Sequence, residues 1–196
     1  IHPAPDEGAN TGRDFCTICW IKEIFGLNPV ALHHGEKLEE ATDLSLTTPS
    51  GSLAFTRTYR QNKHAVYQQA LGLGWTHNHA ASLVKAGSPA TITVQMPNGG
   101  EAKYTFASTT SGIDRYDGMP GVGSYIEFNT SSQRYTLFGL DKSTYVFDHD
   151  AVTNTGKLLS FTSSTGETWT YCYNVDEQNC ATGNQLLNVQ DAYGNK

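Results

Sequence analysis

The sequence predicts a mainly β fold of short antiparallel strands and hairpins. The chain of 196 residues contains 10 Tyr, 8 Phe and 19 Gly, and aromatic residues favour strands whereas Gly favours turns. Apolar and polar residues alternate in several short runs, which is the period of a strand. Few segments are rich in the Ala, Leu, Glu and Lys that favour helices.

The N-terminal 27 residues differ from the rest of the chain. Residues 1–13 contain four Gly or Pro residues and no periodicity, which indicates an extended lead. Residues 14–27 predict a short amphipathic helix that ends near Gly26. We expect this helix to plug an open end of the sheet or cover an edge strand; binding to a partner or a membrane surface is the alternative. Its apolar residues recur at helical spacing: Phe15, Ile18, Ile21, Ile24 and Phe25.

Strands are predicted along the chain from residue 28 onward. Residues 53–59 alternate between two faces, and the Gly-rich residues 72–74 predict a tight turn that leads to Trp75. Residues 92–96 and 104–106 predict a hairpin, because Pro97-Asn98-Gly99-Gly100 between them has turn chemistry. Further strands are predicted at residues 125–128, 135–138 and 145–147. Residues 107–123 are rich in Ser, Thr, Gly and Asp and predict a long surface loop.

The C-terminal third contains an internal repeat. Residues 158–166 (LLSFTSSTG) and 186–194 (LLNVQDAYG) align without gaps at an offset of 28 residues. Trp169, Tyr171 and Tyr173 lie between the two blocks on one face of a predicted strand. The repeating unit is therefore a strand, a tight turn, an aromatic strand and a loop. Such units bury their apolar face only against their neighbours.

Several of these segments resemble one known family. The phrases at residues 28–30 (NPV), 35–37 (GEK), 42–44 (TDL), 53–59 (LAFTRTY) and 72–77 (GLGWTH) are similar to the opening segment of bacterial RHS/YD-repeat proteins, which form the large β-shells of polymorphic toxins and are related to teneurins. Residues 156–159 (GKLL) and 171–173 (YCY) resemble YD-repeat strands. The resemblance covers residues 28–85 and 141–196, although the YD dipeptide is absent and Asn174 follows Tyr173.

The resemblance implies a curved or spiral RHS-like sheet that closes into a hollow shell around a C-terminal passenger. It implies three regions: residues 1–27 as the lead and helix, residues 28–140 as an RHS N-terminal β region, and residues 141–196 as the start of YD-like repeats. The expected partners are the remainder of the shell and the enclosed passenger. The self-cleaving aspartate chemistry of the family lies near the end of the full shell, so no catalytic residue and no cofactor is assigned.

Composition and charge exclude other classes of protein. The net charge of −6 repels phosphate backbones, so nucleic-acid binding is not expected. No apolar run approaches the roughly 20 residues of a membrane span. Four cysteines in two local pairs favour an oxidising compartment, which predicts a secreted or cell-surface protein.

The two cysteine pairs have different interpretations. Cys16 and Cys19 have the spacing of a metal knuckle, and a disulfide, idle thiols, a structural zinc site and redox chemistry all stay open. Cys172 and Cys180 flank a polar loop. A disulfide there would stabilise the fold by about 2.5 kcal/mol in the chain-entropy model.

Histidines supply the other candidate metal ligands. His33 and His34 lie within a few residues of three glutamates and could begin a metal or acid–base site; a solvated polar connection before the first strand is the simpler interpretation. His77 and His79 alternate with Trp75 on one strand face, where packing in the sheet competes with metal binding. The glutamates concerned are Glu36, Glu39 and Glu40.

Aromatic residues supply a candidate binding surface. Trp75, Trp169, Tyr171 and Tyr173 could form a platform that stacks on sugar rings, or they could fill the seams between strands. We therefore expect a non-enzymatic structural segment of a shell that encloses a toxin or other passenger. The alternatives are a cell-surface adhesion or carbohydrate-binding β module, and a hydrolase or metal enzyme built on the histidines.

Overall fold

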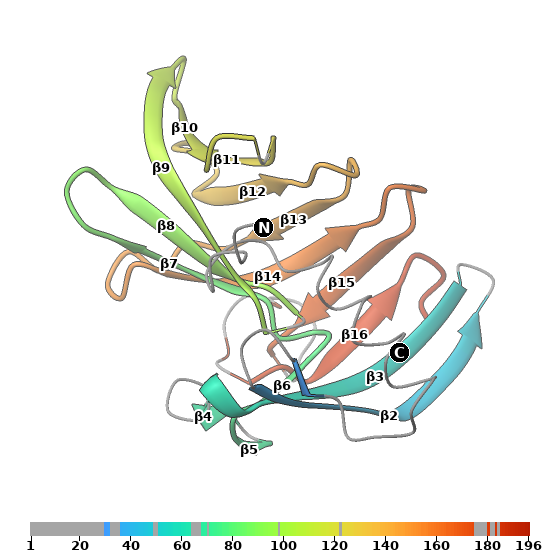
Figure 1. The fold of residues 1–196 in the computed structure, drawn as a ribbon. Helices are drawn as coiled ribbons and strands as arrows, with labels where there is room; N and C mark the ends of the chain where they lie inside the picture. Colours follow the sequence, from blue (N-terminus) through green and yellow to red (C-terminus); the bar gives the residue numbers. More distant parts are fainter. Residues whose placement is uncertain are drawn as a thin grey trace. The chain divides into compact units, whose positions relative to one another are not determined.

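The computed structural model describes residues 30–31, 36–48, 51–63, 68–69, 71–97, 99–121, 123–174, 180, 183 and 185–196. Strands dominate these residues, and the only helical element among them is the 3-10 turn η1 (Gln61–Lys63). The predicted mainly β fold is therefore confirmed (Figure 1). The predicted N-terminal helix, Cys16, Cys19, His33 and His34 lie outside the described residues.

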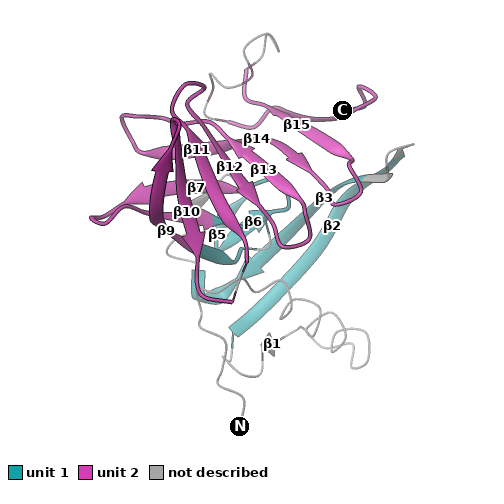
Figure 2. Cartoon of the chain, turned by 90° about the horizontal axis from the view of Figure 1, so that it is seen from above, with its two compact units in different colours: residues 1–47, 52–80, 95–102 teal, residues 48–51, 81–94, 103–196 magenta. Residues whose placement is uncertain are grey.

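The described chain forms two compact units (Figure 2). Unit 1 comprises residues 1–47, 52–80 and 95–102, and unit 2 comprises residues 48–51, 81–94 and 103–196. The units interleave along the sequence because the turn of one hairpin, residues 95–102, groups with unit 1. The boundaries predicted at residues 28 and 141 follow the sequence pattern and stay predictions.

Unit 1 contains a four-stranded sheet in the order β1-β2-β3-β6 and a separate pair, β4-β5. Trp75 and Tyr59 are direct cross-strand partners, and Gly74 allows their approach. Gly74 has a φ of +77°, and a Cβ there would lie 2.8 Å from the Tyr59 ring, so the predicted Gly-rich turn needs glycine at this position. The strands are β1 (Val30–Ala31), β2 (Glu36–Thr48), β3 (Gly51–Arg60), β4 (Gln68–Gln69), β5 (Gly72–Leu73) and β6 (Trp75–His77).

Unit 2 is built on a ten-stranded sheet in the order β13-β12-β11-β10-β9-β8-β7-β14-β15-β16. An additional pairing of β13 with β14 closes the eight strands from β7 to β14 into a barrel. The strands are β7 (Ser82–Ala86), β8 (Thr91–Gln95), β9 (Glu101–Thr110), β10 (Ile113–Gly118), β11 (Tyr125–Asn129), β12 (Arg134–Phe138), β13 (Thr144–Phe147), β14 (Thr155–Thr162), β15 (Thr168–Cys172) and β16 (Asn188–Asp191). The predicted sheet is therefore curved far enough to meet itself.

Alternate residues of the barrel strands form the core. β8, β11 and β12 each bury their second and fourth residues, as expected for strands with one face inward. An eight-stranded barrel has an interior that side chains can just fill. All eight strands of the barrel contribute residues that are at most 2 % exposed: Leu83, Ile92, Val94, Tyr104, Tyr116, Ile126, Tyr135, Leu137, Phe147 and Leu158.

One predicted loop is a hairpin. Residues 107–123 contain the end of β9 and all of β10, which pair around a turn at Ser111 and Gly112. Both turn residues have positive φ values of 51° and 79°. The prediction of a surface loop was wrong because most of the abundant Ser, Thr and Asp of this segment are exposed residues of a hairpin, while Tyr116 points into the core and is 1 % exposed.

Candidate functional site

The strand β14 connects the closed barrel to the open part of the sheet. One of its edges pairs with β13, from Thr144↔Thr162 to Phe147↔Leu158. The other edge is divided between two strands, because residues 155–157 pair with β7 and residues 160–162 pair with β15. The pairings of β14 with β7 and β13 therefore close the barrel, and its pairing with β15 begins a ladder that continues to β16.

Gly156 marks the point of closure. It is the direct partner of Leu83 on β7. A Cβ at this position would lie 2.5 Å from the carbonyl oxygen of Asp148 and 2.9 Å from Leu83 Cγ. Both distances are shorter than a van der Waals contact, so only glycine permits these strands to approach so closely.

An aromatic ladder runs from the barrel into the open part of the sheet. Tyr145, Phe161 and Trp169 are successive cross-strand partners on β13, β14 and β15. The ring centroids of the first pair lie 4.6 Å apart and those of the second pair 5.4 Å apart. Burial raises the pKa of Tyr145 to about 12. Pairs of this kind stabilise neighbouring strands, so the ladder fixes the register in which β15 joins the barrel.

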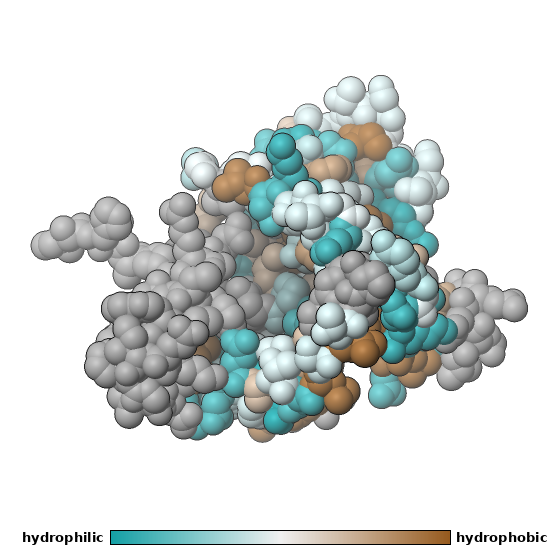
Figure 3. Space-filling model, turned by 90° about the vertical axis from the view of Figure 1, so that its right-hand side faces the viewer, coloured by the Kyte–Doolittle hydropathy of each residue, from teal (hydrophilic) through white to brown (hydrophobic). Residues whose placement is uncertain are grey.

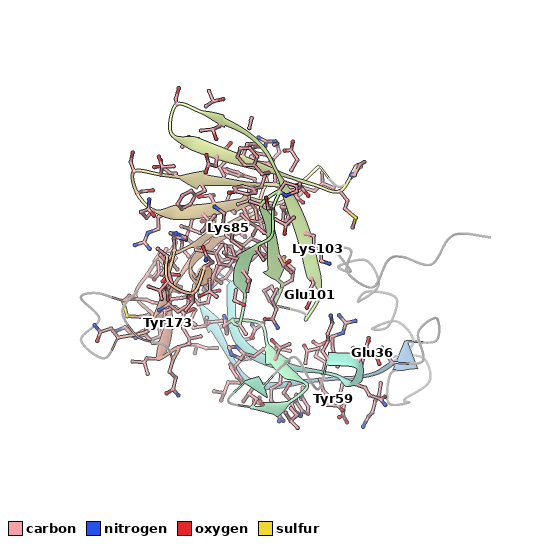
Figure 4. The ribbon with its side chains drawn as sticks, turned by 90° about the vertical axis from the view of Figure 1, so that its left-hand side faces the viewer. Glu36, Tyr59, Lys85, Glu101, Lys103 and Tyr173 are labelled. Carbon is pink, nitrogen blue, oxygen red and sulfur yellow. A yellow bond between two sulfur atoms is a disulfide. The ribbon has the colours of Figure 1, made fainter. Side chains whose placement is uncertain are left out.

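Tyr171, on β15, and Tyr173, just after it, are both buried. The Tyr173 hydroxyl donates a hydrogen bond to the carbonyl oxygen of Leu158 at 2.9 Å, and the Lys157 ammonium lies 5.1 Å from the centre of the Tyr173 ring. The Lys157 ammonium also contacts the Asp148 carboxylate at 3.7 Å. These contacts join the aromatic strand to the barrel, and Tyr173 is labelled in Figure 4.

The disulfide predicted between Cys172 and Cys180 is present. The backbone N–H of Tyr173 donates to the carbonyl of Cys180 at 2.8 Å, and that of Leu187 donates to the carbonyl of Cys172 at 2.8 Å. The cross-link and the two hydrogen bonds therefore draw both ends of the polar loop together beside β15.

The two copies of the internal repeat form turns with the same hydrogen bonds. In the first turn the N–H of Ser163 donates to the carbonyl of Glu167, and in the second the N–H of Asp191 donates to that of Asn195. The side chain at the first position accepts a bond from the N–H four residues later in both turns. The glycines three residues later, 166 and 194, have φ values of 91° and 87°. The offset of 28 residues therefore repeats a structure as well as a sequence.

The four aromatic residues of the predicted platform lie in different parts of the structure. Trp75 belongs to unit 1, where its ring lies 5.4 Å from that of Tyr59 and 4.9 Å from the Arg57 guanidinium. Tyr171 and Tyr173 are 4 % and 9 % exposed, and Trp169 stacks on Phe161. On the face drawn in Figure 3, apolar residues form separate patches among hydrophilic ones. The structure therefore places these four aromatic residues as packing residues of two units.

His77 and His79 lie together in unit 1 with Phe55. The two imidazole centroids are 6.3 Å apart, and that of His77 is 5.1 Å from the Phe55 ring. His77 Nδ1 accepts a hydrogen bond from the backbone N–H of His79, and His79 Nε2 contacts the carbonyl of Ala54 at 2.8 Å. Burial, and secondly the neighbouring His79, lower the pKa of His77 to about 4; burial also lowers the pKa of His79.

Metal binding has no support in the described part of the chain, where no three His, Cys, Asp or Glu side chains gather. Glu36, expected to be solvated, is 2 % exposed and begins β2. Its carboxylate accepts two bonds from the Arg60 guanidinium, at 2.8 and 3.2 Å, and Arg60 also donates to the carbonyl of Gly99 at 3.1 Å. The solvated connection predicted around these glutamates was therefore wrong for residues 36–40, which belong to β2. The buried ion pair went unpredicted because Arg60 is 24 residues away from Glu36.

Comparisons with known proteins give two matches. Residues 27–104 match a family model described as a domain of unknown function, DUF6531. A chain of the Photorhabdus luminescens Tc holotoxin pore is similar in structure, with 19 % sequence identity and a TM-score of 0.46 over 79 % of this chain. The match spans 10 % of that longer chain. No curated protein matches. No helix among the described residues is long and apolar enough to cross a membrane.

Proposed function

We propose that this chain is a non-enzymatic structural segment of an RHS/YD-repeat shell that encloses a toxin or other passenger. The observation that carries the proposal is the divided edge of β14, where a closed barrel gives rise to a ladder of repeated strands. A wall can be extended by adding such repeats, because each unit pairs with its neighbour.

Two further features support this proposal. The two turns of the repeat share their hydrogen bonds, so one local geometry serves successive strands. The segment that resembles the opening of RHS proteins, residues 28–85, lies within the stretch that matches the DUF6531 model.

The expected partners are the other strands of the shell and its passenger. The Cys172–Cys180 disulfide supports a secreted or cell-surface location, because disulfides persist in oxidising compartments. No observation in the described residues favours the carbohydrate-binding alternative, since Tyr171 and Tyr173 are buried.

Protease protection in the full-length protein that carries this chain tests the proposal. We expect the passenger to resist protease and to appear as density inside a β-walled shell by electron microscopy. Trp169→Asp places a charge in the aromatic ladder and should expose the passenger. Thr165→Asp adds the same charge at an exposed turn and should not.

Two results would count against enclosure. One is a passenger that protease digests as fast in the intact protein as when it is isolated. The other is glycan binding by the chain that Trp169→Ala abolishes while the circular dichroism spectrum is unchanged, because that result favours the carbohydrate-binding module.

A further inference from the structure

A group of polar atoms without partners lies inside the barrel of unit 2. The Tyr135 hydroxyl and His149 Nδ1 are both buried and have no hydrogen-bond partner. Tyr135 is 0 % exposed. Buried polar atoms are rarely left unpaired, because their desolvation is then uncompensated. These two atoms are therefore available to hydrogen-bond a polar group of a ligand.

Contacts among the rings place these two atoms in one cluster. The ring of Phe128 lies 4.4 Å from that of Tyr135 and 5.1 Å from that of His149, centroid to centroid. The rings of Tyr135 and His149 are 5.4 Å apart. Phe128 and Tyr135 are also cross-strand partners of β11 and β12. The sheet itself thus holds the cluster in place.

A cation completes the cluster. The Lys85 ammonium lies 5.7 Å from the centres of both the Phe128 and the Tyr116 rings. Lys85 has the same parity on β7 as the buried Leu83, so it faces the barrel interior, and Figure 4 labels it among the barrel side chains. It makes no ion pair with any described carboxylate within 4.0 Å.

The chemistry of the cluster suits an anion. Lys85 supplies three N–H donors, the Tyr135 hydroxyl supplies one, and a neutral imidazole donates from Nδ1 in one tautomer. Burial raises the pKa of Tyr135, so its hydroxyl keeps its proton and donates. The nearest acid by strand register is Asp114, the partner of Phe128, and its Oδ1 accepts a bond from Thr109 at 2.7 Å. The Tyr135 hydroxyl and His149 Nδ1 therefore have no acceptor in the cluster, and the acids Asp114 and Asp150 act on Tyr135 and His149 through their charge alone.

We propose that Lys85, Tyr135 and His149 form a binding site for a carboxylate group inside the barrel of unit 2. The two carboxylate oxygens offer acceptors for all three donors, and bonds between charged groups are stronger than neutral ones. Lys85 and His149 are half-buried, and the flexible four-carbon stem of Lys85 can move aside for entry and then close over the anion. The carboxylate can belong to a small free acid or to an acidic side chain of a polypeptide.

Titration of the 196-residue chain with acetate, followed by NMR of the Tyr135 and His149 ring signals, tests this site. We expect saturable shifts with acetate and none with acetamide, which has the same shape and no charge. Capped Gly-Glu-Gly peptide, compared with acetate at equal concentration, distinguishes a polypeptide carboxylate from a free acid. Tighter binding of the peptide identifies the polypeptide source, and tighter binding of acetate the free acid.

Matched variants assign the shifts to the proposed residues. Lys85→Met removes the charge and keeps most of the stem, and Tyr135→Phe removes only the hydroxyl. Each should raise the half-saturating acetate concentration about tenfold or more. Lys103→Met removes an exposed lysine of β9, on the opposite strand face from the buried Tyr104, and should leave the titration unchanged.

Three results would overturn the proposal. They are the absence of a saturable shift with either carboxylate, equal shifts with acetate and acetamide, and titrations of folded Lys85→Met and Tyr135→Phe that match the unmodified chain. Circular dichroism establishes that both variants fold. Since neither shell assembly nor a passenger enters this experiment, its outcome is independent of the proposed enclosure.

Discussion

Truncation of Leu158 tests the register of β14 in the barrel. Leu158 is 0 % exposed and pairs with Phe147, whereas the adjacent Leu159 is half-buried. Removing three carbons from a fully buried leucine costs the transfer energy of those atoms and leaves a cavity. Large-to-small changes of this kind cost about 2.7–5.0 kcal/mol.

The matched variant Leu159→Ala removes the same atoms one residue later. Because successive side chains point to opposite faces of a strand, we expect it to cost about 1 kcal/mol or less, near the value for a surface change. In a chain of this size, 1 kcal/mol corresponds to a shift of about 2–4 °C in Tm. Leu158→Ala should therefore lower Tm by at least about 5 °C, and Leu159→Ala by a few degrees at most.

Thermal and urea unfolding of the two variants measure this difference. A one-residue slip of β14 would exchange the faces of the two leucines. Equal losses of stability, or a larger loss for Leu159→Ala, would therefore refute the register and with it the closure of the barrel by β14.

Three further predictions follow from features of both units. Gly156→Ala should destabilise unit 2 by about 1–3 kcal/mol or more in urea unfolding, because its Cβ would overlap a backbone oxygen. Replacing both Cys172 and Cys180 by Ser should cost about 2–3 kcal/mol, measured in the same way, because the loop gains freedom in the unfolded state. Lowering the pH should destabilise unit 1: the folded-state pKa of His77, about 4, lies below its ordinary value of 6.5, so its contribution is complete above pH 6.5 and is lost as the pH falls toward 4.

Each of these predictions has a control. Gly121→Ala places a Cβ in open space but at a φ of +89°, so it measures backbone strain without overlap and should cost less than Gly156→Ala. A reducing agent should destabilise the unmodified chain and leave the double serine variant unchanged. His77→Gln should flatten the pH dependence between 6.5 and 4; an unaltered slope would contradict the assignment to His77.

Local sequence patterns predict the strands and turns of this chain well. The alternation at residues 92–96 and the turn at Pro97–Gly100 predict the β8–β9 hairpin, whose Met96 N–H donates to Gly100 at 2.8 Å. The strands predicted at residues 125–128, 135–138 and 145–147 correspond to β11, β12 and β13. These features depend on residues close together in the sequence, so the signal for each lies within a few residues.

Pairing between distant segments accounts for what the sequence did not reveal. The closure of the barrel joins residues 155–157 to residues 82–84, and nothing in either segment specifies the other. The same applies to Glu36 and Arg60, and to Lys85, Tyr135 and His149, whose proximity depends on the curvature of the whole sheet. The Cys172–Cys180 disulfide could be predicted from the sequence because the two cysteines lie only 8 residues apart.

In the shell proposed above, the divided edge of β14 would give the addition of strands a direction. A ring of strands offers no place for another strand, whereas a ladder accepts one at its last rung, which among the described strands is β16. In the proposed shell, strands would consequently be added beyond β16 in one direction, and each newly synthesised hairpin would find its template already formed by the preceding one. A shell of any length could then be built without a second protein that determines its length.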